Sequence, residues 1–246
     1  LSKAGQDESV LECGTHWPYN EAAKLALAAA GATPSALHNN CSGKHAAMLA
    51  FAKHAGEDLA SYTAIYHPVQ QAILKCVGEF AEVSTNEIAL AVDGCAAPNF
   101  AMPVAAMAKS FMNLIDPSGF DEKTALACRR IVSAMTAFPE LIGGSERLDT
   151  MVMQAAEGRI ISKVGADGVW LCGVLPCEKW PSGLAIALKI EDGDDRRGRP
   201  VIAVELLRQL DILTIQDLPE VSPMPIKNRR GDVVGRVEAS LTKTLS

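Results

Sequence analysis

The hydrophobic pattern along most of the chain predicts helices separated by sharp breaks. Asn20 is a favourable residue at the start of a helix, and Gly31 lies just past the end of the pattern that follows it. Gly56 ends a second pattern in the same way, and Pro68 suits the first turn of a third. The predicted helices cover residues 20–30, 43–55, 68–81, 103–114, 121–138, 148–156 and 200–213.

Short apolar runs joined by turn residues predict strands. Residues 88–92 (IALAV) are uniformly apolar, which is typical of a buried strand. Three more strands are predicted at residues 158–164, 168–175 and 183–190, and the GADG segment at 165–168 favours a hairpin turn. Consecutive strands joined by tight turns pair antiparallel. The pattern therefore predicts an α+β fold, in which a mainly antiparallel sheet is flanked by helices.

Composition narrows the class of protein. A chain of 246 residues with 48% hydrophobic residues can bury a sizeable core, in one large domain or in two closely packed ones. Of these, we expect a single domain over residues 1–246. The formal charge of −6 argues against nucleic acid or an anionic membrane as the main partner. No apolar run approaches the roughly 20 residues that a membrane span needs.

Cysteine usage indicates a reducing compartment. The chain has seven cysteines, an odd number at irregular spacing, which does not resemble a secreted disulfide framework. The first ten residues lack the basic start and apolar stretch of a signal peptide. We therefore expect a cytoplasmic protein whose thiols are mostly buried, with a few that act as ligands themselves.

The segment HNNCSGKH, residues 38–45, places reactive side chains against the start of a predicted helix. Cys41 lies at the helix N-terminus, where unpaired N–H groups and the helix dipole favour a thiolate. Lys44 and His45 follow three and four residues later, on the same helical face. The alternative interpretation is that Cys41 is a small buried apolar residue and Lys44 a surface charge.

A second thiol follows the apolar run at residues 88–92. Cys95 lies in a loop two residues after Asp93, at the end of the predicted strand. Two cysteines and one nitrogen ligand suit a zinc ion that keeps its fourth position open. Spacing alone selects Cys41, Cys95 and His45 as the ligands. The alternative is a packed thiol beside an aspartate that forms a turn.

A third segment, SKVGADG at residues 162–168, places Lys163 near the end of a strand and ahead of a glycine turn. This order resembles the Lys-Thr-Gly element of serine acyl-enzymes, in which a lysine on a strand faces a serine nucleophile. Neither SALH at residues 35–38 nor SERL at residues 145–148 supplies the Ser-x-x-Lys sequence that accompanies such an element.

Together, the segments ECGTHWP, LHNNCSGKHAAML, DGCAAPNFAMP, RLDT and SKVGADGVW resemble the rhizobial-type (class 3) L-asparaginase family, also called the asparaginase II family. They occur in the order of that family through nearly the whole chain. The resemblance implies a fold like that of serine β-lactamases and glutaminases, with a helical subdomain, in a protein that is usually a homodimer. It implies hydrolysis of L-asparagine to L-aspartate and ammonia.

The resemblance also implies roles for particular residues. Cys41, Lys44 and Cys95 correspond to the zinc ligands, with water in the remaining position, which leaves His45 a supporting role. A lysine must lose its proton to bind a metal, and a neighbouring cation in a desolvated pocket lowers its pKa. Asp93 corresponds to an aspartate of the active-site hydrogen-bond network. Lys163 corresponds to the lysine that pairs with a serine as general base.

The resemblance places the serine partner of Lys163 upstream of Leu1, so that this chain would lack its N-terminal part. Two alternative functions follow from the same residues. The first is a related serine hydrolase such as a glutaminase. The second is a non-catalytic protein that binds zinc or senses redox conditions through its thiols.

Overall fold

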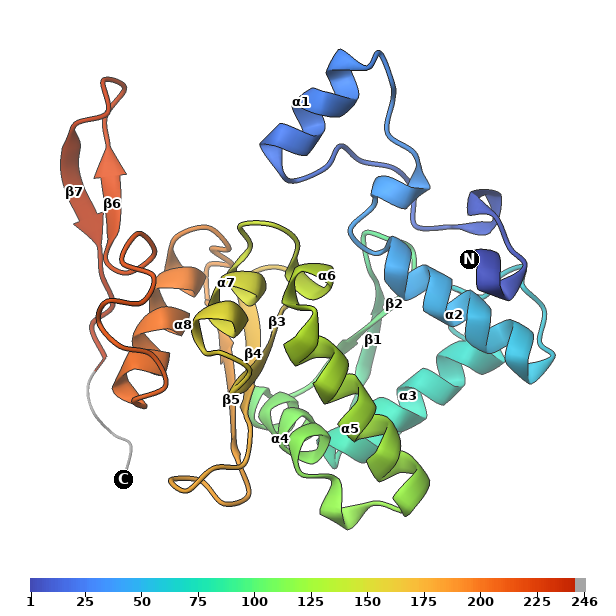
Figure 1. Ribbon diagram of the computed structural model, residues 1–246. Helices are drawn as coiled ribbons and strands as arrows, with labels where there is room; N and C mark the ends of the chain where they lie inside the picture. Colours follow the sequence, from blue (N-terminus) through green and yellow to red (C-terminus); the bar gives the residue numbers. More distant parts are fainter. Residues whose placement is uncertain (242–246) are drawn as a thin grey trace. The chain divides into compact units, whose positions relative to one another are not determined.

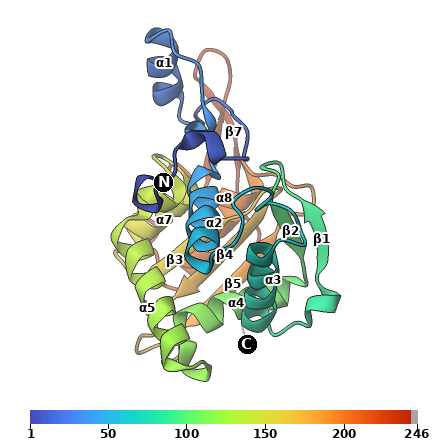
Figure 2. The ribbon, with the colours of Figure 1, turned by 90° about the vertical axis from the view of Figure 1, so that its right-hand side faces the viewer.

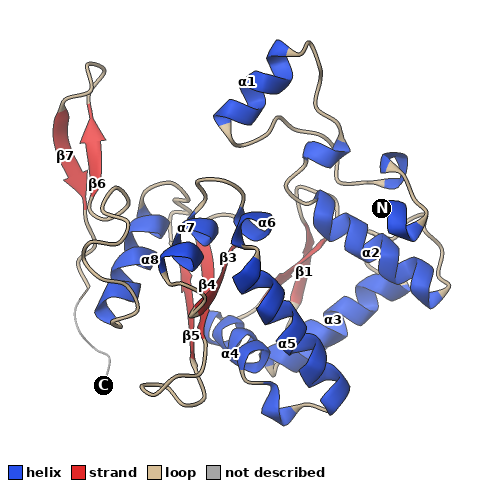
Figure 3. Cartoon of the chain, in the orientation of Figure 1, coloured by secondary structure: helices blue, strands red, loops and turns tan. Residues whose placement is uncertain are grey.

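The computed structural model describes residues 1–241 (Figure 1). The chain divides into two compact units, Leu1–Pro103 and Val104–Ser246. Helices and small antiparallel sheets alternate along the described residues, so the predicted α+β class is confirmed (Figure 3). All seven cysteines are free thiols. Among the described residues, every helix is too short or too polar to cross a membrane.

The first unit is mainly helical and contains one hairpin. Its elements are α1 (Glu21–Ala29), α2 (Ser42–Ala55), α3 (Pro68–Ala81), β1 (Ala89–Val92) and β2 (Pro98–Ala101). The helix ends follow the predicted signals. The Asn20 side chain accepts a hydrogen bond from the backbone N–H of Ala23 at 2.9 Å, and Gly56 ends α2 in the left-handed region with φ of 74°.

The core of the first unit forms where α2 and α3 meet the loop between them. Leu49 and Ala52 of α2, Tyr62 of the loop and Val69 of α3 are almost completely buried in one cluster, which also includes Cys95. The hairpin loop that carries Cys95 is therefore packed against this helical core, so the core sets the position of its thiol.

The prediction of a buried strand at residues 88–92 is wrong in one respect. A strand forms, but every residue of β1 is exposed, and Val92 is 77% exposed. Only Ile88, which precedes it, is buried. The reason is topological: β1 pairs with β2 alone in a two-stranded sheet. A short apolar run predicts a strand but not what covers it.

The second unit is built on a three-stranded antiparallel sheet of order β3-β4-β5, whose strands run side by side in both views (Figures 1 and 2). The strands are β3 (Ile160–Val164), β4 (Val169–Val174) and β5 (Leu184–Lys189), as the sequence predicted. The remaining elements are α4 (Val104–Ile115), α5 (Glu122–Ala137), α6 (Pro139–Gly143), α7 (Leu148–Ala155), α8 (Gly198–Gln209), β6 (Met224–Lys227) and β7 (Val233–Val237). The short α6 was not predicted.

The hairpin between β3 and β4 turns where the sequence predicted. Asp167 and Gly168 both have positive φ, of 53° and 79°. A Cβ atom on Gly168 would lie 2.7 Å from the Cβ of Ile190. Glycine is required there for both conformation and space.

The core of the second unit lies between the sheet, α7 and α8. Trp170 of β4, Val152 of α7 and Leu207 of α8 are all completely buried in one cluster. The charged segment at residues 191–199 is partly built into this unit. Arg199 is only 4% exposed and its guanidinium forms an ion pair with Asp195.

Candidate active site

The loop before α2 is anchored by Asn39, which fixes the backbone of Cys41. The side-chain oxygen of Asn39 accepts a hydrogen bond from the backbone N–H of Cys41 at 2.8 Å. Its amide nitrogen donates to the carbonyl of Cys13 at 2.7 Å. Asn39 is buried, so these bonds are shielded from competing water. Cys41 is thereby held at the N-cap position of α2.

The hairpin loop between β1 and β2 presents Asp93 and Cys95. The backbone N–H of Asp93 donates to the carbonyl of Ala97 at 2.8 Å, and the N–H of Ala96 donates to the carbonyl of Asp93 at 2.9 Å. Ala96 adopts a φ of 70°. These bonds close a tight loop that buries Cys95 and leaves Asp93 half-buried.

These two segments bring three ligand-type groups together in the first unit. The sulfurs of Cys41 and Cys95 and a carboxylate oxygen of Asp93 all lie within 4.8 Å of one another. Two sulfur donors and an oxygen donor at this spacing fit a zinc ion, which binds thiolate and carboxylate ligands. The donor set is therefore suitable for the metal that the resemblance implies.

Lys44 borders the same cluster through Asp93. Its Nζ donates a hydrogen bond to Oδ2 of Asp93 at 3.3 Å. Both side chains are partly exposed, and ion pairs of this kind contribute only about 0–1 kcal/mol. Separating the two groups therefore costs little. Lys44 lies one turn of α2 after Cys41, as its spacing predicted.

Burial and charge set the protonation of this cluster. Burial raises the pKa of the Cys41 thiol to about 11, although the nearby Lys44 opposes the change. Burial therefore opposes the predicted thiolate at Cys41, because desolvation penalises the charged form. Burial works against the charge of Asp93, but Lys44 keeps its pKa below the usual value.

Metal binding requires a lowered pKa at Lys44, but the pKa of Lys44 is raised. Burial lowers its pKa, but the Cys41 and Cys95 sulfurs and the Asp93 carboxylate together raise it above the usual value. The surroundings of Lys44 therefore favour its ammonium form. Deprotonation of Lys44 has to be driven by the bound cation itself.

His45 follows Lys44 in α2 and is completely buried. Its Nδ1 is 2.5 Å from the hydroxyl oxygen of Tyr62, which also accepts a hydrogen bond from the backbone N–H of Glu12 at 2.9 Å. Burial lowers the pKa of the imidazole. The selection of His45 as a ligand from spacing alone is not supported. Among the described residues, the potential ligand group contains Asp93 in its place.

Lys163 belongs to the second unit, on β3. Its side chain is 49% exposed. Its Nζ donates to the carbonyl of Val164 at 2.7 Å and lies 3.8 Å from Oδ2 of Asp149. The lysine is thus partly open to solvent near the end of β3.

Asp149 is a candidate that sequence reasoning missed. It is completely buried in α7, and its oxygens accept hydrogen bonds from the Ser162 hydroxyl at 2.6 Å and the backbone N–H of Val164 at 2.9 Å. The Ser162 hydroxyl also accepts a bond from the indole N–H of Trp170 at 2.8 Å. The available signal was an aspartate in the RLDT segment, although its contact with β3 appears only in the fold.

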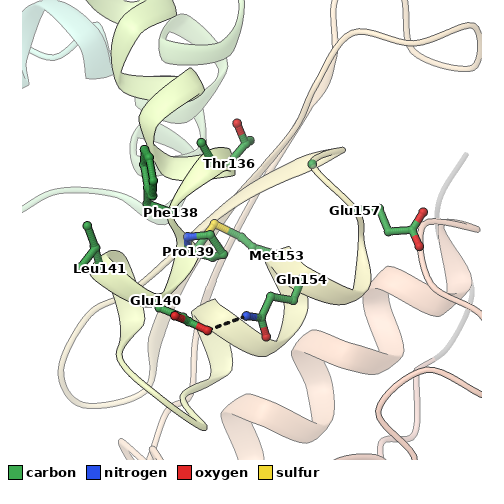
Figure 4. Close-up of a pocket in the computed structure, with 10 residues that line it drawn as sticks. Thr136, Phe138, Pro139, Glu140, Leu141, Met153, Gln154 and Glu157 are labelled. Atoms are coloured by element: carbon green, nitrogen blue, oxygen red, sulfur yellow. Dashed lines mark hydrogen bonds between the residues drawn. The ribbon is translucent and has the colours of Figure 1, made fainter.

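The second unit also contains a largely apolar cavity that none of the candidate residues lines. It has a volume of about 600 Å³ and lies between the end of α5, α6 and α7 (Figure 4). Its walls are largely apolar, with Phe138, Leu141 and Met153 among them, and Glu140 accepts a hydrogen bond from Gln154 at 3.2 Å. None of the described residues that line this cavity carries a thiol or an amine, so the cavity lacks the groups that the sequence singled out as metal ligands or bases.

Comparison with known proteins identifies the family. The model of the L-asparaginase II family matches residues 1–239 of the chain. A search of curated proteins finds none that matches this chain. The match spans both units, including the Cys41, Asp93 and Cys95 cluster and the strand that carries Lys163. The chain therefore belongs to the L-asparaginase II family, whose members are asparaginase-type amidohydrolases.

Proposed function

We propose that this protein is an L-asparaginase, which hydrolyses the side-chain amide of L-asparagine to give L-aspartate and ammonia. The observation that carries the proposal is the meeting of Cys41, Lys44, Asp93 and Cys95 from two distant segments. Two thiols, an amine and a carboxylate in one place form a polar site with the donor atoms that a metal ion needs. Membership of the asparaginase family supports this reading of the site.

We assign Cys41, Lys44 and Cys95 as the residues that hold a zinc ion. Such an ion acts as a Lewis acid that anchors and polarises polar groups of the substrate. Before metal binds, Asp93 holds Lys44 as an ammonium group. When Lys44 gives up its proton, the Asp93 carboxylate is released from this pair and can accept a hydrogen bond from another group at the site.

We assign Lys163 as the general base for nucleophilic amide hydrolysis. Its unprotonated amine accepts the proton of a serine hydroxyl while the serine oxygen attacks the amide carbon. The C–N bond then breaks, and the lysine returns the proton to the leaving ammonia. Water next attacks the acyl-enzyme, again with Lys163 as proton acceptor, which releases L-aspartate and restores the serine. The serine is expected upstream of Leu1.

We also propose that the protein acts as a homodimer. Exposed apolar side chains on the β6–β7 hairpin support association, since Val233 and Val234 are each 63% exposed. Light scattering coupled to gel filtration measures the mass directly. A mass of one chain at micromolar concentration contradicts this part of the proposal.

The function is tested by measuring both products, L-aspartate and ammonia, from L-asparagine and from L-glutamine. The chain is used together with the residues expected upstream of Leu1. We expect equal amounts of the two products from L-asparagine and much slower release from L-glutamine. Faster release from L-glutamine favours a glutaminase. Zinc binding without hydrolysis of either amide favours a metal-binding or redox-sensing protein.

A further inference from the structure

The free edge of β3 places Lys163 beside a buried carboxylate. β3 is an edge strand of its sheet. At the end of the β3–β4 ladder, the N–H of Gly165 donates to the carbonyl of Val169 at 2.9 Å. Bonded pairs alternate along an antiparallel ladder. The N–H and C=O groups of the preceding residue, Val164, therefore point away from the sheet.

Side chains form hydrogen bonds with both of these outward-pointing backbone groups. The N–H of Val164 donates to Oδ2 of Asp149 at 2.9 Å, and its carbonyl accepts from Nζ of Lys163 at 2.7 Å. The same Oδ2 lies 3.8 Å from that Nζ. The lysine Nζ thus lies between one backbone carbonyl and one carboxylate, and that carboxylate is itself bonded to the end of β3.

The carboxylate itself is rigidly held. Its other oxygen accepts the Ser162 hydroxyl at 2.6 Å, which is bound in turn by the Trp170 indole at 2.8 Å. All three residues are completely buried. Asp149 also lies in the first turn of α7, where the helix dipole favours a negative charge. Water and salt therefore screen its charge much less than that of a surface carboxylate.

A lysine side chain that is half exposed normally samples many rotamers, and fixing one of them costs conformational entropy. We propose that Asp149 is the positioning residue for Lys163, because it holds both the Val164 peptide and the lysine Nζ at the place from which the amine transfers protons. This inference rests on the function proposed above for Lys163. Asp149 acts through Lys163 and does not touch the reacting atoms.

The test compares the Asp149→Asn variant with the parent protein. The variant keeps the size of the side chain but removes its charge and one acceptor oxygen. The matched control is Thr150→Val, at the next position of α7, which removes a buried hydrogen bond of 2.7 Å to the carbonyl of Gly144 without touching Lys163. Thr150 lies in the same helix as Asp149 and is also buried, and its replacement likewise removes a hydrogen bond.

We expect D149N to lower kcat at least about tenfold, because misplacing a reacting group by about 1 Å can cost a hundredfold in rate. KM and zinc content should stay within about twofold of the parent values, since the metal cluster is unchanged. T150V should lose thermal stability but keep its kcat. A D149N variant that resembles T150V in every respect overturns the proposal.

A second measurement needs no variant at position 149. The chain is labelled at lysine Cε, the Lys163 signal is assigned by its loss in Lys163→Met, and its relaxation is compared with that of Lys75, whose side chain is 76% exposed. We expect Lys163 to be clearly more ordered than Lys75. Equal mobility of the two side chains contradicts the proposal, whether or not D149N folds.

The K163M variant separates this inference from the proposed function. Full activity in K163M refutes the catalytic assignment of Lys163, and the role of Asp149 with it. An inactive K163M beside a fully active D149N refutes only the role of Asp149. Loss of activity in both, with T150V active, supports the two assignments together.

Discussion

The Nζ of Lys44 lies 3.3 Å from Oδ2 of Asp93, so the amine expected to bind zinc is held by a carboxylate that borders the same two thiols. The ammonium form of Lys44 pairs with Asp93, whereas only the neutral amine can bind a metal. Ion pair and metal ligation at Lys44 therefore exclude each other. The carboxylate is also close enough to the thiols to be a ligand itself.

Replacing either thiol of the cluster should remove stoichiometric zinc. In Cys41→Ser and Cys95→Ser, one sulfur donor is lost, so we expect zinc affinity to fall by more than the roughly 10–100-fold that follows loss of an outer partner. Zinc content of the purified protein measures this directly. The control is Cys76→Ser, since Cys76 is an exposed thiol of α3 outside the cluster. Unchanged zinc content in C41S contradicts the site.

The choice between Lys44 and Asp93 as third ligand can be decided by two matched variants. Lys44→Met removes the amine, and Asp93→Asn removes the carboxylate charge while keeping the shape. If Lys44 is the ligand, K44M weakens zinc binding more than D93N does, by about tenfold or more. Competition with a chelator of known affinity gives both values. The reverse order identifies Asp93 as the ligand.

The sequence predicted the helices well because the signals that end them are local. Asn20, Gly56 and Pro68 act within one turn of the helix that they cap or start, and the structure places each at its predicted position. The antiparallel hairpin at Gly168 depends on the same kind of local chemistry, since its turn needs a positive φ.

Features that depend on distant parts of the chain could not be predicted in this way. The exposure of β1 depends on which strands pair with it, and the raised pKa of Cys41 depends on what buries the thiol. Asp149 lies 13 residues from Ser162 in sequence, and nothing local indicates that α7 lies against the edge of β3. Burial and tertiary contact decide each of these properties.

Lys163→Met should abolish amide hydrolysis while leaving the fold and the zinc content unchanged. Methionine keeps most of the length of the side chain but cannot accept a proton. Because Lys163 is partly exposed and lies outside the core, the variant should remain folded, and losing the partner of the buried Asp149 should lower its stability. Activity, zinc content and thermal unfolding are measured on one preparation. Normal turnover in K163M removes the assigned role.

Asp194 should stabilise the turn that leads into α8. Its carboxylate accepts hydrogen bonds from the backbone N–H groups of Arg196 and Arg197 at 2.8 and 3.0 Å, which lower its pKa from 3.8 to about 2. We expect Asp194→Ala to cost about 1 kcal/mol of unfolding free energy at pH 7. Because the folded-state pKa is lowered, this contribution is present above pH 3.8 and is lost as the pH falls towards about 2.

Urea unfolding at pH 7 and at low pH measures this contribution. The matched control is Glu191→Gln, which removes an exposed acidic charge from the same segment. Its stability should remain within about 0.5 kcal/mol of the parent. An equal loss of stability in D194A and E191Q would show that the effect comes from net charge rather than from the turn.

Leu207→Ala should strongly destabilise the second unit. Leu207 is completely buried beside Trp170 in its core, and truncating a buried leucine to alanine costs about 2–5 kcal/mol. Tryptophan fluorescence during urea unfolding reports on this core. The exposed Leu141, with 83% of its surface accessible, provides the control Leu141→Ala, which should change stability by no more than about 0.5 kcal/mol.

The central claim is tested most directly by ammonia release from L-asparagine, measured on the chain with the residues expected upstream of Leu1. The parent protein should release ammonia and L-aspartate in equal amounts, and K163M and C41S, measured alongside it, should show whether Lys163 and the thiol cluster are required. We predict turnover in the parent and none in K163M. A parent protein that binds zinc but releases no ammonia from L-asparagine would contradict the assignment as an L-asparaginase.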